Sequence, residues 1–241
     1  MARRRGSARR RRRGGSGFLY KLLSVLLICG CLVAAVTLFF RVDTVVITGE
    51  KRYTEAEIRE ASGVADGDNL FLLNKYQVIR NIADALPYIE IENTHIQRKL
   101  PDTLLIQVQE CGDPLAWEQD GIVWLVSPAG KIVEQKTSTA GYPTIDGCRL
   151  LAPSVGTLIA LDTENDTRWQ SLLELLAALE AADKLGEVDA IHIGNAAYLT
   201  MDYMGRFSVE LNYDADFAYK LRTLDAILAS GKIQENMTGT F

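Results

Sequence analysis

The first clear pattern along the chain is an almost unbroken run of hydrophobic residues. Residues 18–40 contain a single charged side chain, Lys21. As a helix of roughly 1.5 Å per residue, the uncharged stretch 22–40 would extend about 28 Å, which matches the hydrocarbon core of a bilayer. The pattern predicts one transmembrane helix near the N-terminus. A cleaved signal peptide is disfavoured, because the apolar run continues for too long and no small-x-small site follows it.

Beyond this run, the pattern changes from strand to helix. Residues 42–48 are rich in β-branched side chains and predict a strand. Thr54 and Glu57 form a capping box, in which each side chain reaches the backbone amide of the other, and they predict a short helix. Asn74 caps a second helix, whose apolar residues recur at helical spacing until Pro87 stops it.

A hairpin is expected after the two helices. Its first strand covers 89–96, where the apolar residues change face midway, which indicates a β-bulge at 92–93. Residues 98–102 provide the turn, and 104–108 alternate between apolar and polar side chains on the returning strand. The order of elements is therefore strand, helix, helix, strand, strand.

The second half of the chain repeats this mixture of elements. Hydrophobic segments at 122–126 and 131–133 flank a turn that contains proline and glycine, which predicts another hairpin. Thr167 and Gln170 form a second capping box and predict a helix with one apolar face. Such a helix is expected to pack on a sheet.

The last part of the chain predicts three strands and a helix. The strands are expected at 188–193, 197–203 and 207–213, the last of which alternates cleanly between apolar and polar residues. The helix is expected to begin near Asp214 and to end at Gly231. These strands predict a mostly antiparallel sheet.

Several short motifs occur at the ends of the elements between residues 42 and 110. They are Val42 to Gly49, Asp68-Asn69-Leu70-Phe71, Leu86-Pro87-Tyr88-Ile89, Arg98-Lys99-Leu100-Pro101-Asp102-Thr103-Leu104 and Gln109-Glu110. Together with the order of elements and the adjacent membrane span, they resemble the FtsQ-type POTRA domain of the FtsQ/DivIB family of bacterial cell-division proteins. The Pro and Gly residues at 142–147 and the helix after them resemble the second domain of that family.

The fold class expected from pattern and resemblance is α+β. A basic cytoplasmic tail covers 1–17 and the transmembrane helix 18–40. The POTRA domain, with the order β-α-α-β-β, covers 42–110. An extracytoplasmic α+β domain like the β domain of FtsQ/DivIB proteins, with a mostly antiparallel sheet, covers 111–241.

Charge separates the two sides of the membrane. The arginines before the span are Arg3, Arg4, Arg5, Arg9, Arg10, Arg11, Arg12 and Arg13. Such a cluster resists translocation and is attracted to anionic lipid, so we expect a cytoplasmic N-terminus and extracytoplasmic C-terminal domains. Residues 42–241 hold 16 basic and 31 acidic side chains, a net charge of about −15. This acidity argues against nucleic acid as a partner and favours cationic partner surfaces.

The residues offer little catalytic chemistry. His95 and His192 lie on separate predicted strands, outside any metal-ligand spacing, and we expect both to be ordinary strand residues. No nucleophile elbow, phosphate loop or dinucleotide motif occurs. We therefore expect no enzyme activity, no catalytic, cofactor or metal site, and no small-molecule substrate. Cys111 and Cys148 could form a disulfide or could be small core residues, and spacing leaves both open.

The resemblance implies a function. FtsQ/DivIB proteins are non-enzymatic scaffolds that link early and late division proteins at the septum. The expected protein is therefore a single-pass cell-membrane protein of the division septum. Its expected partners are membrane lipid and small bitopic proteins of the FtsB/DivIC and FtsL kind.

The resemblance also implies where a partner binds, because the family uses the last strands of its β domain. The corresponding residues are Tyr213, Thr238, Gly239, Thr240 and Phe241. An edge strand there could pair with a partner strand, while Phe241 or Tyr213 fills a pocket. The chain stops at what looks like the start of a strand, so either the sequence is a truncated form or this strand is short.

Two other functions remain open at this point. The first is a POTRA-bearing envelope assembly or secretion component, although no run of barrel strands follows. The second is an envelope sensor or peptidoglycan-binding protein, which would need a groove lined with aromatic residues. Trp117 and Trp124 lie in a predicted hairpin, which favours packing over such a groove.

Overall fold

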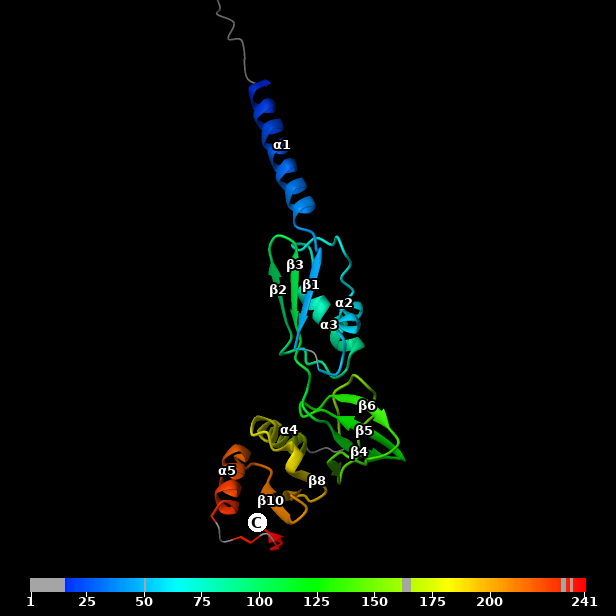
Figure 1. Cartoon of the computed structure of the whole chain (residues 1–241), viewed down its shortest axis with the longest axis vertical. Coiled ribbons are helices and arrows are strands. Elements are labelled where there is room, and N and C mark those ends of the chain that lie inside the picture. The colour runs from blue at the N-terminus through cyan, green and yellow to red at the C-terminus, as the bar shows by residue number, and fades with distance from the viewer. Residues whose placement is uncertain (1–15, 50, 162–165, 231–232, 235) are drawn as a thin grey trace, which may run out of the picture. The chain divides into compact units, whose positions relative to one another are not determined.

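The computed structural model describes residues 16–49, 51–161, 166–230, 233–234 and 236–241 (Figure 1). Helix α1(Ser16–Phe39) contains the predicted apolar run except for its last residue, Phe40. Within the described ranges it is the one helix long and apolar enough to cross a membrane. The described chain divides into two compact units. The first holds α1 and the residues after it up to Val46, with 65–73 and 97–105, and the second holds 47–64, 74–96 and 106–241.

The elements after α1 follow the predicted order. Their bounds are β1(Thr44–Thr48), α2(Glu55–Ser62), α3(Lys75–Ala85), β2(His95–Lys99) and β3(Thr103–Gln107). The three strands form one sheet in the order β1-β3-β2. This arrangement confirms the predicted POTRA order. The boundaries expected at 42–110 and 111–241 stay a prediction.

Local hydrogen bonds explain where both helices begin. The Thr54 hydroxyl accepts from the amide of Glu57, and the Glu57 carboxylate accepts from the amide of Thr54 at 2.8 Å, so the predicted capping box is confirmed. Gly63 ends α2 in the left-handed conformation at φ 67°. The Asn74 side chain accepts from the amides of Tyr76 and Gln77 and caps α3.

The predicted first strand of the hairpin is wrong in extent. Strand β2 begins at His95, and Ile89 makes only an isolated bridge to Glu110. The Thr94 hydroxyl donates to the carbonyl of Glu90 at 2.6 Å. This local bond closes a turn where a bulged strand was expected, because a threonine side chain can compete with a strand for backbone partners.

The second unit contains an eight-stranded sheet in the order β11-β10-β9-β8-β7-β4-β5-β6. Its strands are β4(Leu115–Gln119), β5(Ile122–Val126), β6(Ile132–Lys136), β7(Thr144–Asp146), β8(Val188–His192), β9(Tyr198–Tyr203), β10(Phe207–Asn212) and β11(Gly239–Thr240). The pairings β4–β5, β5–β6, β8–β9 and β9–β10 are antiparallel. Strand β7 pairs in parallel with both neighbours, and β11 in parallel with β10. The expected α+β fold with a mostly antiparallel sheet is confirmed.

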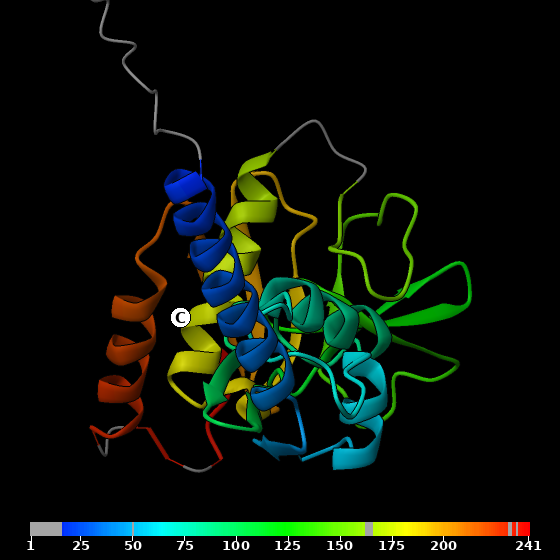
Figure 2. The same ribbon diagram turned by 90° about the horizontal axis from the view of Figure 1, so that it is seen from above.

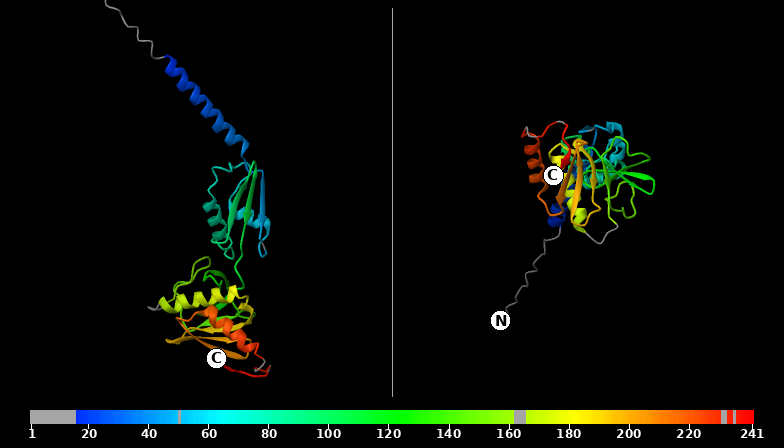
Figure 3. Two further views of the ribbon diagram at one scale, coloured as in Figure 1. Left: turned by 90° about the vertical axis from the view of Figure 1, so that its left-hand side faces the viewer. Right: turned by 90° about the horizontal axis from the view of Figure 1, so that it is seen from below.

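Two helices, α4(Asp166–Ala181) and α5(Phe217–Leu228), lie next to each other against this sheet (Figures 2 and 3). Leu176 of α4 and Leu221 of α5 belong to one buried cluster with Leu199 and Met201 of β9. The alternate residues of β9, such as Asp202, are partly exposed and face the other way. The sheet therefore has a core face and a polar face. A short helix, η1(Leu185–Glu187), precedes β8.

The structure corrects both predicted helix starts. Helix α4 begins at Asp166, so Thr167 has a helical backbone and cannot be the N-cap of a capping box. Helix α5 begins at Phe217, where the carboxylate of Asp216 accepts from the amide of Tyr219 at 2.9 Å. Gly231, the expected C-cap, lies outside the described residues.

Candidate partner-binding edge

Four of the five predicted partner-binding residues lie together at one edge of the eight-stranded sheet. Strand β11 is its outermost strand, which confirms the predicted strand start. The amide of Phe241 donates to the carbonyl of Ser208, and the amide of Glu210 donates to the carbonyl of Phe241, both at 3.0 Å. These bonds return the segment after α5 to the side of β10.

The pairing sets which backbone groups of β11 face outward. Gly239 and Phe241 turn their amides toward β10, where they donate to the carbonyls of Arg206 and Ser208. Because neighbouring residues of a strand alternate in direction, the amide and carbonyl of Thr240 point away from β10. Thr240 thus presents a donor and an acceptor at the open edge, where another strand could pair.

Aromatic side chains flank this edge. The ring centroids of Phe207 and Phe241 are 5.3 Å apart, and Phe241 remains 38% exposed. The guanidinium of Arg206 lies 4.8 Å from the centroid of the Phe207 ring. A shallow groove beside them is lined by Ser208, Thr240 and two carboxylates, Asp189 and Asp202. The edge therefore combines backbone pairing groups with an apolar contact and mixed charge.

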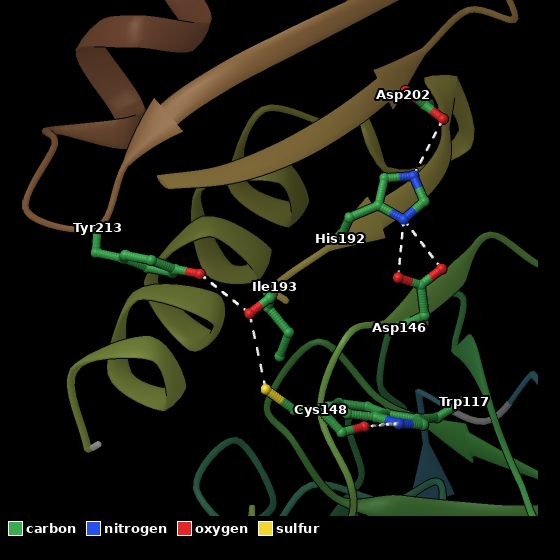
Figure 4. Close-up of polar contacts among 7 residues, drawn as sticks. All are labelled: Trp117, Asp146, Cys148, His192, Ile193, Asp202 and Tyr213. Atoms are coloured by element: carbon green, nitrogen blue, oxygen red, sulfur yellow. Dashed lines mark hydrogen bonds and ion pairs between the residues drawn. The ribbon is translucent and has the colours of Figure 1, made fainter. Parts of the chain in front are cut away.

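Tyr213 lies elsewhere than expected. It is only 8% exposed, and its hydroxyl donates to the carbonyls of Ile193 at 3.1 Å and Asn195 at 2.7 Å (Figure 4). Burial raises the pKa of this phenol. The expectation that Tyr213 fills a partner pocket is therefore corrected: its hydroxyl satisfies buried backbone carbonyls, so the ring is held in the core.

The same close-up shows that Cys148 also points toward the carbonyl of Ile193. The Cys148 thiol lies 3.7 Å from the carbonyl of Ile193, and its own carbonyl accepts from the indole of Trp117 at 3.3 Å (Figure 4). Cys148 and Cys111 are both free thiols. Burial raises the pKa of the Cys111 thiol to about 12, so it stays protonated and unreactive near neutral pH. The disulfide left open by the sequence is not formed in this structure.

His192 joins three strands on the polar face of the sheet. Its Nδ1 lies 2.9 Å from Asp146 of β7, and its Nε2 lies 3.2 Å from Asp202 of β9 (Figure 4). Burial alone would lower the pKa of His192, but the hydrogen bonds to both carboxylates outweigh burial, so this pKa lies above its ordinary value. The imidazole links neighbouring strands. The sequence places His192, Asp146 and Asp202 on strands or near them, but only the register of these strands brings the three side chains together.

The remaining predicted residues fall into two groups. The arginines from Arg3 to Arg13 lie outside the described residues. His95 lies on β2, as expected for a strand residue. Across the ranges that the structure describes, no group of three or more His, Cys, Asp or Glu side chains is placed to hold a metal ion.

Comparison with known proteins matches residues 40–110 to the family model described as "POTRA domain, FtsQ-type". The chain is similar to the cell division protein DivIB of Clostridium tetani, with 24% identity over 192 residues, 79% of this chain and 70% of that protein. It is also similar to the cell division protein FtsQ of Geotalea daltonii, with 28% identity over 70% of this chain. The DivIB protein of Clostridium botulinum is 30% identical over 41% of this chain. The matches span 60% and 37% of the length of these last two relatives.

Proposed function

Because the chain belongs to the FtsQ/DivIB family of cell-division proteins, we propose that it is a non-enzymatic scaffold linking early and late division proteins at the septum. Its relatives are named as cell division proteins, which supports a role in division. A scaffold works by presenting surfaces, and the surface best suited to this task is the β11 edge. The proposed partners are bitopic proteins of the FtsB/DivIC and FtsL kind.

Helix α1 is proposed to anchor this scaffold in the cell membrane as a single pass. The arginines before it would hold the N-terminus in the cytoplasm, so both folded domains would lie outside. A reporter that works only outside the cytoplasm should be active when fused after Phe241 and inactive when fused before Arg3. The reverse pattern would contradict both the orientation and the septal role built on it.

The observation that carries the proposed docking mode is the direction of Thr240. Its amide and carbonyl point away from β10, beside the exposed ring of Phe241. A partner segment in an extended conformation could satisfy both groups by main-chain hydrogen bonds, and an apolar side chain of the partner could pack on Phe241. This mode needs an edge amide at residue 240.

Two substitutions at one position test the docking mode. Thr240→Pro removes the outward amide but keeps the amides of Gly239 and Phe241, which hold β11 on β10. Thr240→Val is the matched control, because it keeps the amide and a β-branched shape. We expect the full chain with Thr240→Pro, or without residues 237–241, to capture the FtsB/DivIC-like partner more weakly. If Thr240→Pro and the deletion of 237–241 both bind the partner with the affinity of the wild type and of Thr240→Val, the partner site lies elsewhere.

A glycan-binding role is less well supported. Trp117 is buried, and Trp124 and Trp169 are partly buried against the same core cluster. These three are the tryptophans of the chain, so none of them stands fully open as a platform for sugar rings. A pull-down that recovered glycan strands in place of division proteins would favour the envelope-sensor function over the scaffold.

A further inference from the structure

The end of α1 is tied by hydrogen bonds to the segment 65–73 within the first unit. The amide of Leu70 donates to the carbonyl of Phe40 at 3.0 Å, and the amide of Val42 donates to the carbonyl of Asp68 at 2.7 Å. The side-chain amide of Asn69 donates to the carbonyl of Val36 at 3.1 Å, so it satisfies one of the last carbonyls of α1. The segment 65–73 therefore lies beside the C-terminal end of the candidate span.

The turn between β2 and β3 joins the same place. The amide of Asp43 donates to the carbonyl of Asp102 at 2.9 Å. The guanidinium of Arg98 donates to the carbonyl of Leu73 at 2.7 Å. Two segments about thirty residues apart in the chain thus both sit beside the first residues after α1, and all of them belong to one compact unit.

Large apolar side chains stand exposed on these two segments. Phe71 is 46% exposed, Leu72 78% and Leu100 57%. We call these three residues the lip. The ring of Phe71 meets the ring of Phe40 edge-on, with centroids 5.0 Å apart, so the lip continues directly from the apolar surface of α1. Scattered exposed apolar residues are common, but here they stand on two segments that both bond to the first residues after a membrane span, which indicates a surface that is covered.

Charged side chains of both signs border the lip. Arg41 follows α1, Lys99 precedes Leu100, and both are exposed, while Asp43, Asp68 and Asp102 lie on the neighbouring backbone. Lys and Arg next to aromatic and aliphatic residues are the composition of the membrane interface, where the apolar groups enter the lipid and the cations meet phosphate. Leu72 and Leu100 would not stabilise the fold if they faced water, because their side chains would remain hydrated.

We propose that the lip inserts into the interfacial region of the bilayer leaflet on the side of the folded domains, with Arg41 and Lys99 at the lipid phosphates. The depth would be about 5 to 10 Å into the headgroup boundary, as for other interfacial apolar surfaces. The proposal rests on the membrane anchoring proposed for α1. The first unit then meets the membrane at three places, which are α1, Phe71 with Leu72, and Leu100. Together they hold this unit at a fixed tilt to the membrane.

Quenching by brominated lipid tests this insertion in the full chain. The protein is reconstituted into vesicles of phosphatidylcholine and phosphatidylglycerol, with bromine near the top of the acyl chains. Leu72→Trp and Leu100→Trp report the lip, and the fluorescence of the unsubstituted chain is subtracted. Phe39→Trp reports the end of α1, and Leu158→Trp, at a residue that is 69% exposed in the second unit, is the matched control.

We expect quenching of Leu72→Trp and Leu100→Trp comparable with that of Phe39→Trp, and none of Leu158→Trp. If Phe39→Trp is quenched and the two lip variants are not, the lip proposal is overturned while the anchoring stands. In that case a protein partner, in place of lipid, is the occupant that remains for the lip. If Phe39→Trp itself is not quenched, the anchoring fails first. Equal quenching of Leu158→Trp would remove the specificity on which the proposal depends.

Discussion

Replacing Ile106 by Ala tests the strand parity of the POTRA sheet. Leu104 and Ile106 are fully buried on β3, while Gln107 is exposed. The substitution removes three buried carbon atoms, which at about 0.8 kcal/mol each is about 2.4 kcal/mol of lost transfer free energy. The cavity left behind adds to this, so we expect a total cost of about 2 to 5 kcal/mol in the free energy of unfolding.

The assay is urea unfolding of the full chain in detergent micelles, followed by circular dichroism. Gln107→Ala is the matched control, because it truncates the adjacent side chain on the opposite face and should change the free energy of unfolding by less than about 0.5 kcal/mol. If Ile106→Ala also costs less than about 0.5 kcal/mol, the typical limit for surface sites, the assigned parity of β3 is refuted.

Three further predictions concern folding. A fragment of residues 42–110 should unfold cooperatively in urea, and a broad, non-cooperative transition would show that it is not an independent unit. Gly147→Ala should lower the urea midpoint of unfolding more than Gly141→Ala. Both glycines have positive φ, but only at Gly147 would the new Cβ overlap the backbone nitrogen of Gly194. Equal losses in the two variants would refute this overlap. Because the pKa of His192 is raised in the folded state, its protonated form stabilises the fold fully below about pH 6.5, and this stabilisation is lost as pH rises through the folded pKa. The stability difference between wild type and His192→Gln, at most about 1 kcal/mol for each such exposed pair, should therefore shrink from pH 6 to pH 8. A difference that does not change with pH would contradict this role of His192.

Local signals predicted the helices of the first domain well. Thr54 and Asn74 cap residues two or three positions away, so the hydrogen bonds depend on the local sequence alone. The alternation of β10 is likewise visible in the sequence, because one face is buried and the other is wet. The bounds of β4 cannot be predicted from alternation, because Leu115, Ala116 and Trp117 are all buried, and a strand buried on both faces shows no alternation.

Long-range pairings account for what sequence could not supply. The role of Tyr213 depends on carbonyls near Ile193, which only the fold brings within reach. The lip depends on Leu72 and Leu100, whose segments are linked by the hydrogen bond from Arg98 to Leu73. Exposed leucines carry no sequence signal for such a surface, because single exposed apolar residues occur on most proteins.

The most direct test of the docking edge is amide hydrogen exchange at residues 239–241. In the free protein the amides of Gly239 and Phe241 are already bonded to β10, and that of Thr240 points outward. Binding of the extracytoplasmic segment of an FtsB/DivIC-like partner should therefore slow exchange most at Thr240, because only this amide gains a new acceptor. Exchange at Thr240 that stays unchanged while the partner is bound would contradict strand pairing at β11, and with it the proposed mode of scaffolding.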